Sequence, residues 1–137
     1  MRPRPSLSTS PLSRAAVDAM VLEIVAGTRD KEDESEEATA RRELAEEAGL
    51  VAAKLERLLG TWNTPGVSDQ HTTIFLATGL NNVESRPDGI EEGFMTVERI
   101  ALRDLNSLMA DGTLKDETTV LGLLLARDRL ASSGRLS

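Results

Sequence analysis

Three glutamates lie close together in the stretch ARRELAEEAGL, residues 40–50: Glu43, Glu46 and Glu47. On a helix that turns 100° per residue their side chains fall within an arc of about 100°, beside an apolar stripe. Carboxylates held this close repel one another unless a cation joins them. A divalent cation that prefers oxygen ligands, Mg²⁺ or Mn²⁺, fits better than Zn²⁺, because the chain has no Cys and His71 is its one His.

The same charges have a simpler explanation, in which the helix is a solvated surface with salt bridges. Glu37 with Arg41 and Arg42 with Glu46 are spaced i,i+4, at which opposite charges pair on one helix face. An EF-hand loop is excluded, because DKEDESEEATAR has no Gly at its sixth position and no Glu at its twelfth. The residue types alone therefore leave both the metal site and the solvated helix open.

The local sequence predicts how the glutamates are positioned. Ser35 precedes two glutamates as an N-cap does, and the helix dipole favours acidic residues in the first turn. Gly49 directly after Ala48 is typical of a helix end. Before the helix, the run AMVLEIVAG, residues 19–27, is apolar and β-branched, which predicts a buried strand that leads into a loop.

The remaining patterns predict one α/β domain over residues 14–131. Residues 1–13 are rich in Pro, Ser and Thr and are predicted to be a flexible tail, as are residues 132–137 at the other end. Between them we expect strands in LVAAKLERLLGTW (50–62), HTTIFLATGL (71–80) and FMTVERIAL (94–102), and helices in LRDLNSLMADG (102–112) and KDETTVLGLLLARDRL (115–130).

Charge and composition limit the possible functions. The net charge is -7, and the segment from Asp30 to Glu47 alone holds nine acidic and three basic residues. Nucleic-acid binding needs a basic face, so we expect no nucleic-acid partner. No apolar run approaches the roughly 20 residues that span a bilayer, so we expect no membrane contact. The absence of Cys fits a cytoplasmic protein.

The stretch ESEEATARRELAEEAGL resembles the signature of the Nudix hydrolases, G-x5-E-x7-R-E-U-x-E-E-x-G-U, in which U is aliphatic. The matching positions are Glu34, Arg42, Glu43, Leu44, Glu46, Glu47, Gly49 and Leu50. The first Gly departs from the pattern, since Thr28 stands six residues before Glu34 and Gly27 seven before. A one-residue insertion in the loop accounts for this shift.

The resemblance implies a role for each matched residue. Glu43, Glu46 and Glu47 would ligate Mg²⁺ or Mn²⁺, together with a backbone carbonyl at Ala26 or Gly27. Glu46 is also expected to take part in catalysis. Arg42 and Glu34 would orient these ligands, whereas Arg41 is expected to face solvent.

Other stretches resemble the ADP-ribose pyrophosphatase branch of this family. LEIVAG is similar to the EIPAG of that branch, and Pro65 lies sixteen residues beyond Gly49, at a spacing similar to a marker of the branch. The resemblance implies an α/β/α sandwich with a mixed sheet, and hydrolysis of ADP-ribose to AMP and ribose 5-phosphate. It also favours a strand over 50–62, where the propensities alone would permit a helix.

Further candidates lie outside the signature. A general base in this branch often comes from a distant loop, and GIEEGF supplies Glu92 as first choice and Glu91 as second. The candidate substrate contacts are Arg14, Arg29, Arg86 and Pro65. His71 at the start of a strand is expected to be structural, and Trp62 to lie in the core rather than to stack on an adenine.

Members of the branch usually carry more strands before the one at residues 19–27, so the chain resembles an N-terminally shortened member. This leaves the adenosine pocket and a possible homodimer open. Two alternatives therefore stand beside ADP-ribose hydrolysis. One is hydrolysis of another Nudix substrate, such as a nucleoside triphosphate or a different nucleotide sugar, and the other is an inactive Nudix-like binding module.

Overall fold

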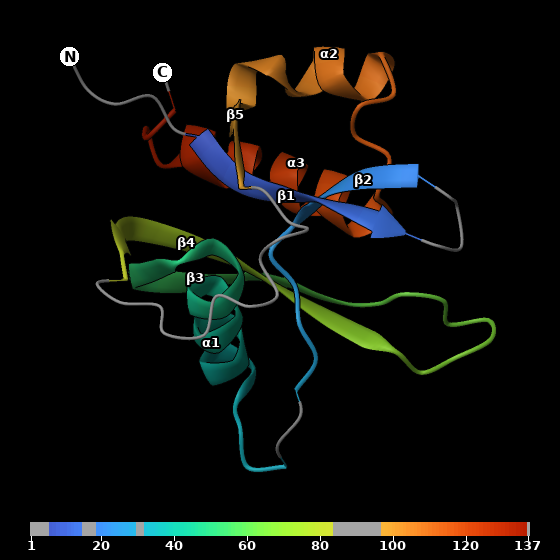
Figure 1. The fold of residues 1–137 in the computed structure, drawn as a ribbon, viewed down its shortest axis with the longest axis vertical. Helices are drawn as coiled ribbons and strands as arrows, with labels where there is room; N and C mark the ends of the chain where they lie inside the picture. Colours follow the sequence, from blue (N-terminus) through green and yellow to red (C-terminus); the bar gives the residue numbers. More distant parts are fainter. Residues whose placement is uncertain (1–5, 15–18, 30–31, 84–96, 137) are drawn as a thin grey trace. The chain divides into compact units, whose positions relative to one another are not determined.

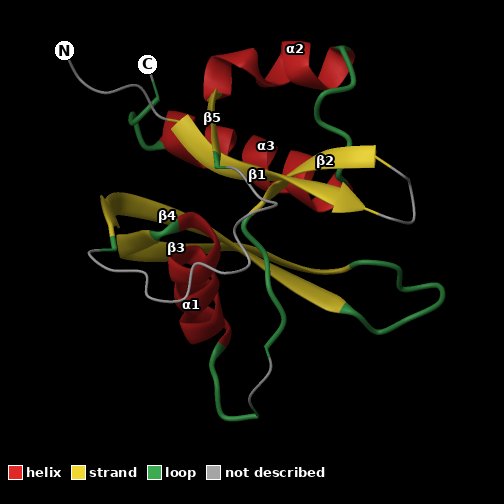
Figure 2. Ribbon diagram, in the orientation of Figure 1, coloured by secondary structure: helices red, strands yellow, loops and turns green. Residues whose placement is uncertain are grey.

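The structure is a computed structural model that describes residues 6–14, 19–29, 32–83 and 97–136. Its elements are strands β1 (Ser6–Arg14) and β2 (Ala19–Ile24), helix α1 (Glu36–Ala48), strands β3 (Leu50–Trp62), β4 (His71–Asn82) and β5 (Glu98–Ala101), the 3-10 turn η2 (Leu102–Asp104), and helices α2 (Leu105–Ala110) and α3 (Glu117–Ser132). Figure 1 shows their arrangement, and Figure 2 colours them by type. The α/β fold class predicted from the sequence is confirmed.

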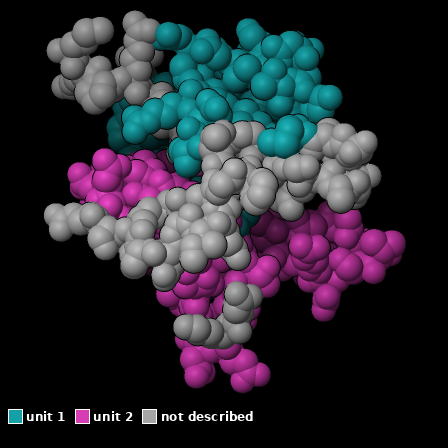
Figure 3. All heavy atoms as spheres, in the orientation of Figure 1, with its two compact units in different colours: residues 1–26, 85–137 teal, residues 27–84 magenta. Residues whose placement is uncertain are grey.

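The chain divides into two compact units, shown in Figure 3. Unit 1 comprises residues 1–26 and 85–137, and unit 2 comprises residues 27–84. Unit 1 contains a three-stranded sheet in the order β2-β1-β5, together with α2 and α3. Unit 2 contains α1 and a hairpin of β3 and β4. The strand pairs of the described residues are all antiparallel.

Unit 1 has an apolar core built mainly from its helices. Leu102, Leu105 and Leu123 are almost completely buried, and their burial stabilises the unit by removing apolar surface from water. Thr119 of α3, also fully buried, accepts a hydrogen bond from the Ile24 amide of β2 at 3.0 Å. This bond ties α3 directly to the sheet.

Strand β1 corrects the prediction of a flexible tail over residues 1–13. Within that range the structure has a strand that begins at Ser6, so the prediction is wrong for residues 6–13. The strand lies in the middle of its sheet and pairs with β2 from Thr9↔Ile24 to Arg14↔Ala19, and with β5 from Ser6↔Ala101 to Thr9↔Glu98. Backbone pairing on both sides does not require apolar side chains, which is why the composition misled.

The C-terminal end also differs from the predicted tail at residues 132–137. Helix α3 ends at Ser132, and the chain then turns back through Gly134, whose φ of 71° lies in the left-handed region. The amides of Arg135 and Leu136 both donate to the Leu130 carbonyl, at 2.9 and 3.2 Å. Residues 133–136 therefore form a hydrogen-bonded helix cap.

Unit 2 consists of α1 packed against a long hairpin. The pairing runs from Leu50↔Asn82 to Trp62↔His71, with a register irregularity between Arg57 and Leu59. A strand over residues 50–62, favoured above by resemblance, is confirmed. In Figure 1 the connecting end of the hairpin extends well beyond α1.

Candidate active site

The caps predicted from the sequence set the ends of α1. The Ser35 side chain accepts a hydrogen bond from the Ala38 amide at 3.1 Å, which satisfies a donor that the helix itself leaves unpaired. Gly49 has a φ of 66°, and its amide donates to the Ala45 carbonyl at 3.0 Å. The helix therefore spans Glu36–Ala48, and its C-terminal half carries the signature glutamates.

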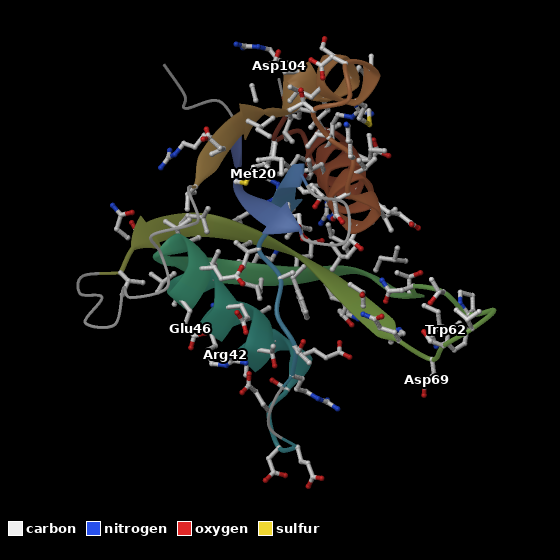
Figure 4. The ribbon with its side chains drawn as sticks, turned by 45° about the vertical axis from the view of Figure 1, so that its right-hand side comes forward. Met20, Arg42, Glu46, Trp62, Asp69 and Asp104 are labelled. Carbon is white, nitrogen blue, oxygen red and sulfur yellow. The ribbon has the colours of Figure 1, made fainter. Side chains whose placement is uncertain are left out.

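Arg42 collects three carboxylates around one guanidinium group. Its Nε donates to Glu34 at 3.1 Å, and its Nη1 contacts Glu43 at 2.9 Å and Glu46 at 3.3 Å. Its Nη2 makes a longer contact of 3.5 Å with the Thr28 carbonyl. Figure 4 shows the Arg42 and Glu46 side chains together on α1. One cation thus links two glutamates of the helix to the loop before it, as the resemblance implied for Arg42 and Glu34.

The carboxylates in turn act on the arginine. The hydrogen bond that Arg42 donates to Glu34 is the largest cause that raises the pKa of Arg42 above its ordinary value, and the charges of Glu34 and Glu43 add to it. Arg42 is therefore positively charged at every physiological pH. The three partners differ in exposure, because the Glu43 side chain is 14% exposed and that of Glu46 is 59% exposed. Glu46 is thus the more accessible of the two helix glutamates.

Gly27 leaves room for the Glu43 side chain. A Cβ atom placed on Gly27 would collide with the carboxyl group of Glu43, so no larger residue fits there without moving the glutamate. The glycine that is displaced by one position from the family pattern therefore still lies against the helix. Ala26 is the last residue of unit 1 in this region, and its predicted carbonyl ligand remains a prediction.

Carboxylate oxygens are the ligands that a hard divalent cation prefers. In the structure, the carboxylates of Glu34, Glu43 and Glu46 surround the Arg42 guanidinium. In the described part of the chain no three acidic or His side chains already stand in a metal-binding group. Glu47 follows Glu46 on α1 and is partly buried. Arg42 contacts Oε1 of Glu43 and Oε2 of Glu46, so the second oxygen of each carboxylate is the one that would ligate a metal ion.

Several predicted residues lie elsewhere or outside the described residues. Arg29 and Pro65 are exposed in loops of unit 2. Arg14 is the last residue of β1, and only its backbone is described. Glu91, Glu92 and Arg86 lie outside the described residues. The structure brings together Arg42, Glu34, Glu43 and Glu46, and it leaves the candidate base untested.

One prediction about side-chain environment is wrong, and another is incomplete. Trp62 was expected in the core, but it is 64% exposed at the end of β3. The Arg41 side chain is 41% exposed and pairs with Glu37, in line with the expectation that it faces solvent, but its Nη1 also donates to the Ala52 carbonyl of β3 at 2.8 Å. Arg41 thus anchors α1 to the hairpin. Its i,i+4 spacing to Glu37 was visible in the sequence, whereas the contact with a distant carbonyl was not.

Comparison with known proteins fits this geometry. The model of the NUDIX domain matches residues 12–118. The chain belongs to the Nudix family. Among curated Nudix relatives, an ADP-ribose pyrophosphatase of Bacillus subtilis is 32% identical over 110 residues, which cover 80% of this chain and 59% of the relative. One of Mycobacterium tuberculosis is 34% identical over 103 residues, or 74% of this chain and 49% of the relative.

A third Nudix relative has a different printed substrate. It is a GDP-mannose pyrophosphatase of Yersinia pestis, 31% identical over 115 residues that cover 79% of this chain and 54% of the relative. A crystal structure of an ADP compounds hydrolase superposes with a TM-score of 0.84 at 25% identity, covering 96% of this chain and 69% of that one. The chain therefore spans roughly half the length of these curated relatives. No helix in the described ranges is long and apolar enough to cross a membrane.

Proposed function

We propose that this Nudix chain hydrolyses a nucleoside diphosphate linked to another moiety, with ADP-ribose as the preferred substrate. The single observation that carries the proposal is the Arg42 cluster, in which one guanidinium contacts Glu34, Glu43 and Glu46. The two ADP-ribose pyrophosphatases among the relatives support the choice of substrate. The products would be AMP and ribose 5-phosphate.

The proposed cofactor is Mg²⁺, with Mn²⁺ as the alternative. Glu43, Glu46 and Glu47 would hold it, with the Ala26 carbonyl as a further oxygen ligand. When bound, such an ion neutralises the diphosphate, polarises the phosphorus and favours ionisation of a water molecule. Carboxylate oxygens without Cys suit these hard ions.

Residues around α1 hold the Glu43 carboxylate in position for the proposed reaction. Arg42 and Glu34 fix the orientation of Glu43 through charge-assisted hydrogen bonds of 3.1 and 2.9 Å. Gly27 lets the Glu43 carboxyl group approach the loop. A water molecule adds to one phosphorus of the diphosphate, the bridging P–O bond breaks, and the proton of the water passes to a general base. We propose Glu92, or else Glu91, as that base.

Three residues are proposed as substrate contacts. The guanidinium groups of Arg14 and Arg29 suit phosphate oxygens, and Arg29 follows Gly27 in the loop before α1. Pro65 would shape the far side of the substrate from the exposed loop between β3 and β4. We further propose that the protein acts in the cytoplasm and forms a homodimer.

A second candidate is hydrolysis of another nucleotide sugar, which the GDP-mannose pyrophosphatase of Yersinia pestis favours. It uses the same glutamates and differs only in the groups that flank the diphosphate. Hydrolysis of a nucleoside triphosphate is a further alternative. An inactive Nudix-like binding module is the remaining alternative.

A substrate panel separates these candidates. The purified chain is incubated with Mg²⁺ and ADP-ribose, GDP-mannose or a nucleoside triphosphate, and the products are separated by ion-exchange chromatography. We expect AMP to form fastest from ADP-ribose. Faster release of GMP from GDP-mannose would make GDP-mannose the preferred substrate in place of ADP-ribose. Faster cleavage of the triphosphate would contradict both nucleotide-sugar assignments. If no product forms from any of these substrates, the inactive binding module is the alternative that remains.

A further inference from the structure

A cationic and aromatic group of side chains lies on the β3–β4 hairpin, apart from the glutamates of α1. It consists of Arg57, His71 and Trp62, around the gap at Gly60. A Cβ placed on Gly60 would collide with Nη2 of Arg57, and it would lie 3.0 Å from Cε1 and 3.2 Å from Nε2 of His71. The guanidinium of Arg57 and the imidazole of His71 therefore both lie over Gly60, where no side chain stands between them.

The register of the hairpin explains why these residues share a face. Trp62 pairs directly with His71, and residues directly opposed on antiparallel strands project from the same side. Gly60 lies two residues before Trp62 and therefore on that side as well. Arg57 would face the other way in a regular strand, but the irregularity between Arg57 and Leu59 shifts the alternation by one residue.

The two basic groups are not neutralised by neighbours. The structure assigns no hydrogen bond or ion pair to the side chains of Arg57 and His71 with any described residue. Arg41 and Arg42, in contrast, each contact glutamates. In a chain with a net charge of -7, an arginine beside an imidazole without a carboxylate is a local site for an anion.

Trp62 adds a flat apolar surface beside this anion site. The side chain is 64% exposed, and it lies about 6.6 Å along the strand from Gly60, the length of two strand residues. An exposed indole next to phosphate-binding groups suits a base that stacks on its ring. Figure 4 shows Trp62 at the end of the hairpin, away from Arg42 and Glu46.

We propose that Arg57, His71 and Trp62 form a binding site for a nucleoside monophosphate. Arg57 and His71 donate hydrogen bonds to the phosphate, and Trp62 stacks on the base. Gly60 is needed because a side chain there would displace the Arg57 guanidinium from its place beside His71. Binding at this site does not require hydrolysis, so it stands apart from the proposed activity.

Trp62 is the one tryptophan of the chain, so its fluorescence reports on this site directly. The full chain in EDTA is titrated with AMP, with adenosine and with inorganic phosphate, while the emission of Trp62 is recorded. We expect AMP to change the emission saturably and at a lower concentration than either fragment. No change with AMP would overturn the proposal, and so would phosphate binding as tightly as AMP, since the site would then recognise an anion only.

A variant and a matched control test whether AMP binds at Arg57. Arg57→Ala should weaken AMP binding at least about tenfold, which is the ratio for one lost charge-assisted hydrogen bond. Lys54→Ala removes an equal charge from the same strand, but Lys54 pairs with Thr78 and projects from the opposite face, so its effect should stay below about twofold. An equal loss of AMP affinity in Arg57→Ala and Lys54→Ala would show that AMP is attracted by the overall charge of the strand and not bound at Arg57, which would overturn the proposal.

Two further outcomes would assign the emission change elsewhere. At the AMP concentration that saturates the parent, Arg57→Ala should show a much smaller emission change, and an unaltered change in that variant would place the nucleotide elsewhere and overturn the proposal. The emission should also be independent of protein concentration. A change with protein concentration but not with AMP would make the exposed Trp62 a contact between copies of the chain, which overturns the nucleotide site.

Discussion

Helices α1 and α3 are held in place by different contacts. Helix α3 of unit 1 buries Leu123, Ala126 and Leu130. Helix α1 of unit 2 buries only Thr39 among its thirteen residues, and it is fixed by a cap at Ser35 and by ion pairs around Arg42. Apolar burial therefore stabilises α3, whereas charged and polar contacts set the position of α1.

This difference indicates how the chain combines stability with chemistry. Most apolar side chains that the structure describes as buried belong to unit 1, while unit 2 contributes Ile74 and Leu76. The carboxylates of Glu43 and Glu46 lie on the weakly buried helix, where the side chains are 14% and 59% exposed.

The largest stability effect should come from the core of unit 1. Leu123→Ala should lower the free energy of unfolding by about 2 to 5 kcal/mol, because it removes a side chain that is almost completely buried and leaves a cavity. Urea denaturation followed by circular dichroism measures the change. Val67→Ala in unit 2 is the control, since Val67 is 88% exposed and should change little. Equal losses in the two variants would contradict the comparison between the units.

A smaller loss is expected at the polar link within unit 1. The Thr119 hydroxyl accepts from the Ile24 amide at 3.0 Å and donates to Asp116 at 2.7 Å. Thr119→Val should cost about 1 to 3 kcal/mol, because the Ile24 amide loses its acceptor and Asp116 keeps only the Thr119 amide of its two donors. Thermal unfolding compared with Thr118→Val, a neighbour that is only partly buried, provides the measurement. Equal losses of stability in Thr119→Val and Thr118→Val would mean that the loss does not come from the hydrogen bond to the Ile24 amide.

Local rules made α1 and its charged cluster predictable. Ser35, Gly49 and the spacing of the glutamates act within a few residues, so they are visible in the sequence. The contact between Arg42 and Glu34 was implied only by the resemblance to the Nudix signature, because Glu34 lies before the helix and no helical spacing relates the two residues. The family signature extends over these same residues.

Contacts between distant segments were not predictable in the same way. The bond from Arg41 to the Ala52 carbonyl depends on how α1 packs on β3. The exposure of Trp62 depends on the length of the hairpin, which extends past α1, so an aromatic residue that composition assigns to the core lies outside it. Strand β1 depends on pairing partners up to residue 101, which the Pro and Ser content of residues 6–13 does not reveal.

The central claim is that Glu43, Glu46 and Glu47 of α1 serve hydrolysis and are not merely a charged surface. The most direct measurement is the rate of AMP formation from ADP-ribose with Mg²⁺ for the parent, for Glu46→Gln and for Glu37→Gln. Glu46→Gln should lower the rate more than about 100-fold, because it removes a proposed metal ligand. Glu37→Gln, the same change at a position that pairs with Arg41, should stay within about twofold of the parent. Parental activity in Glu46→Gln would contradict the account.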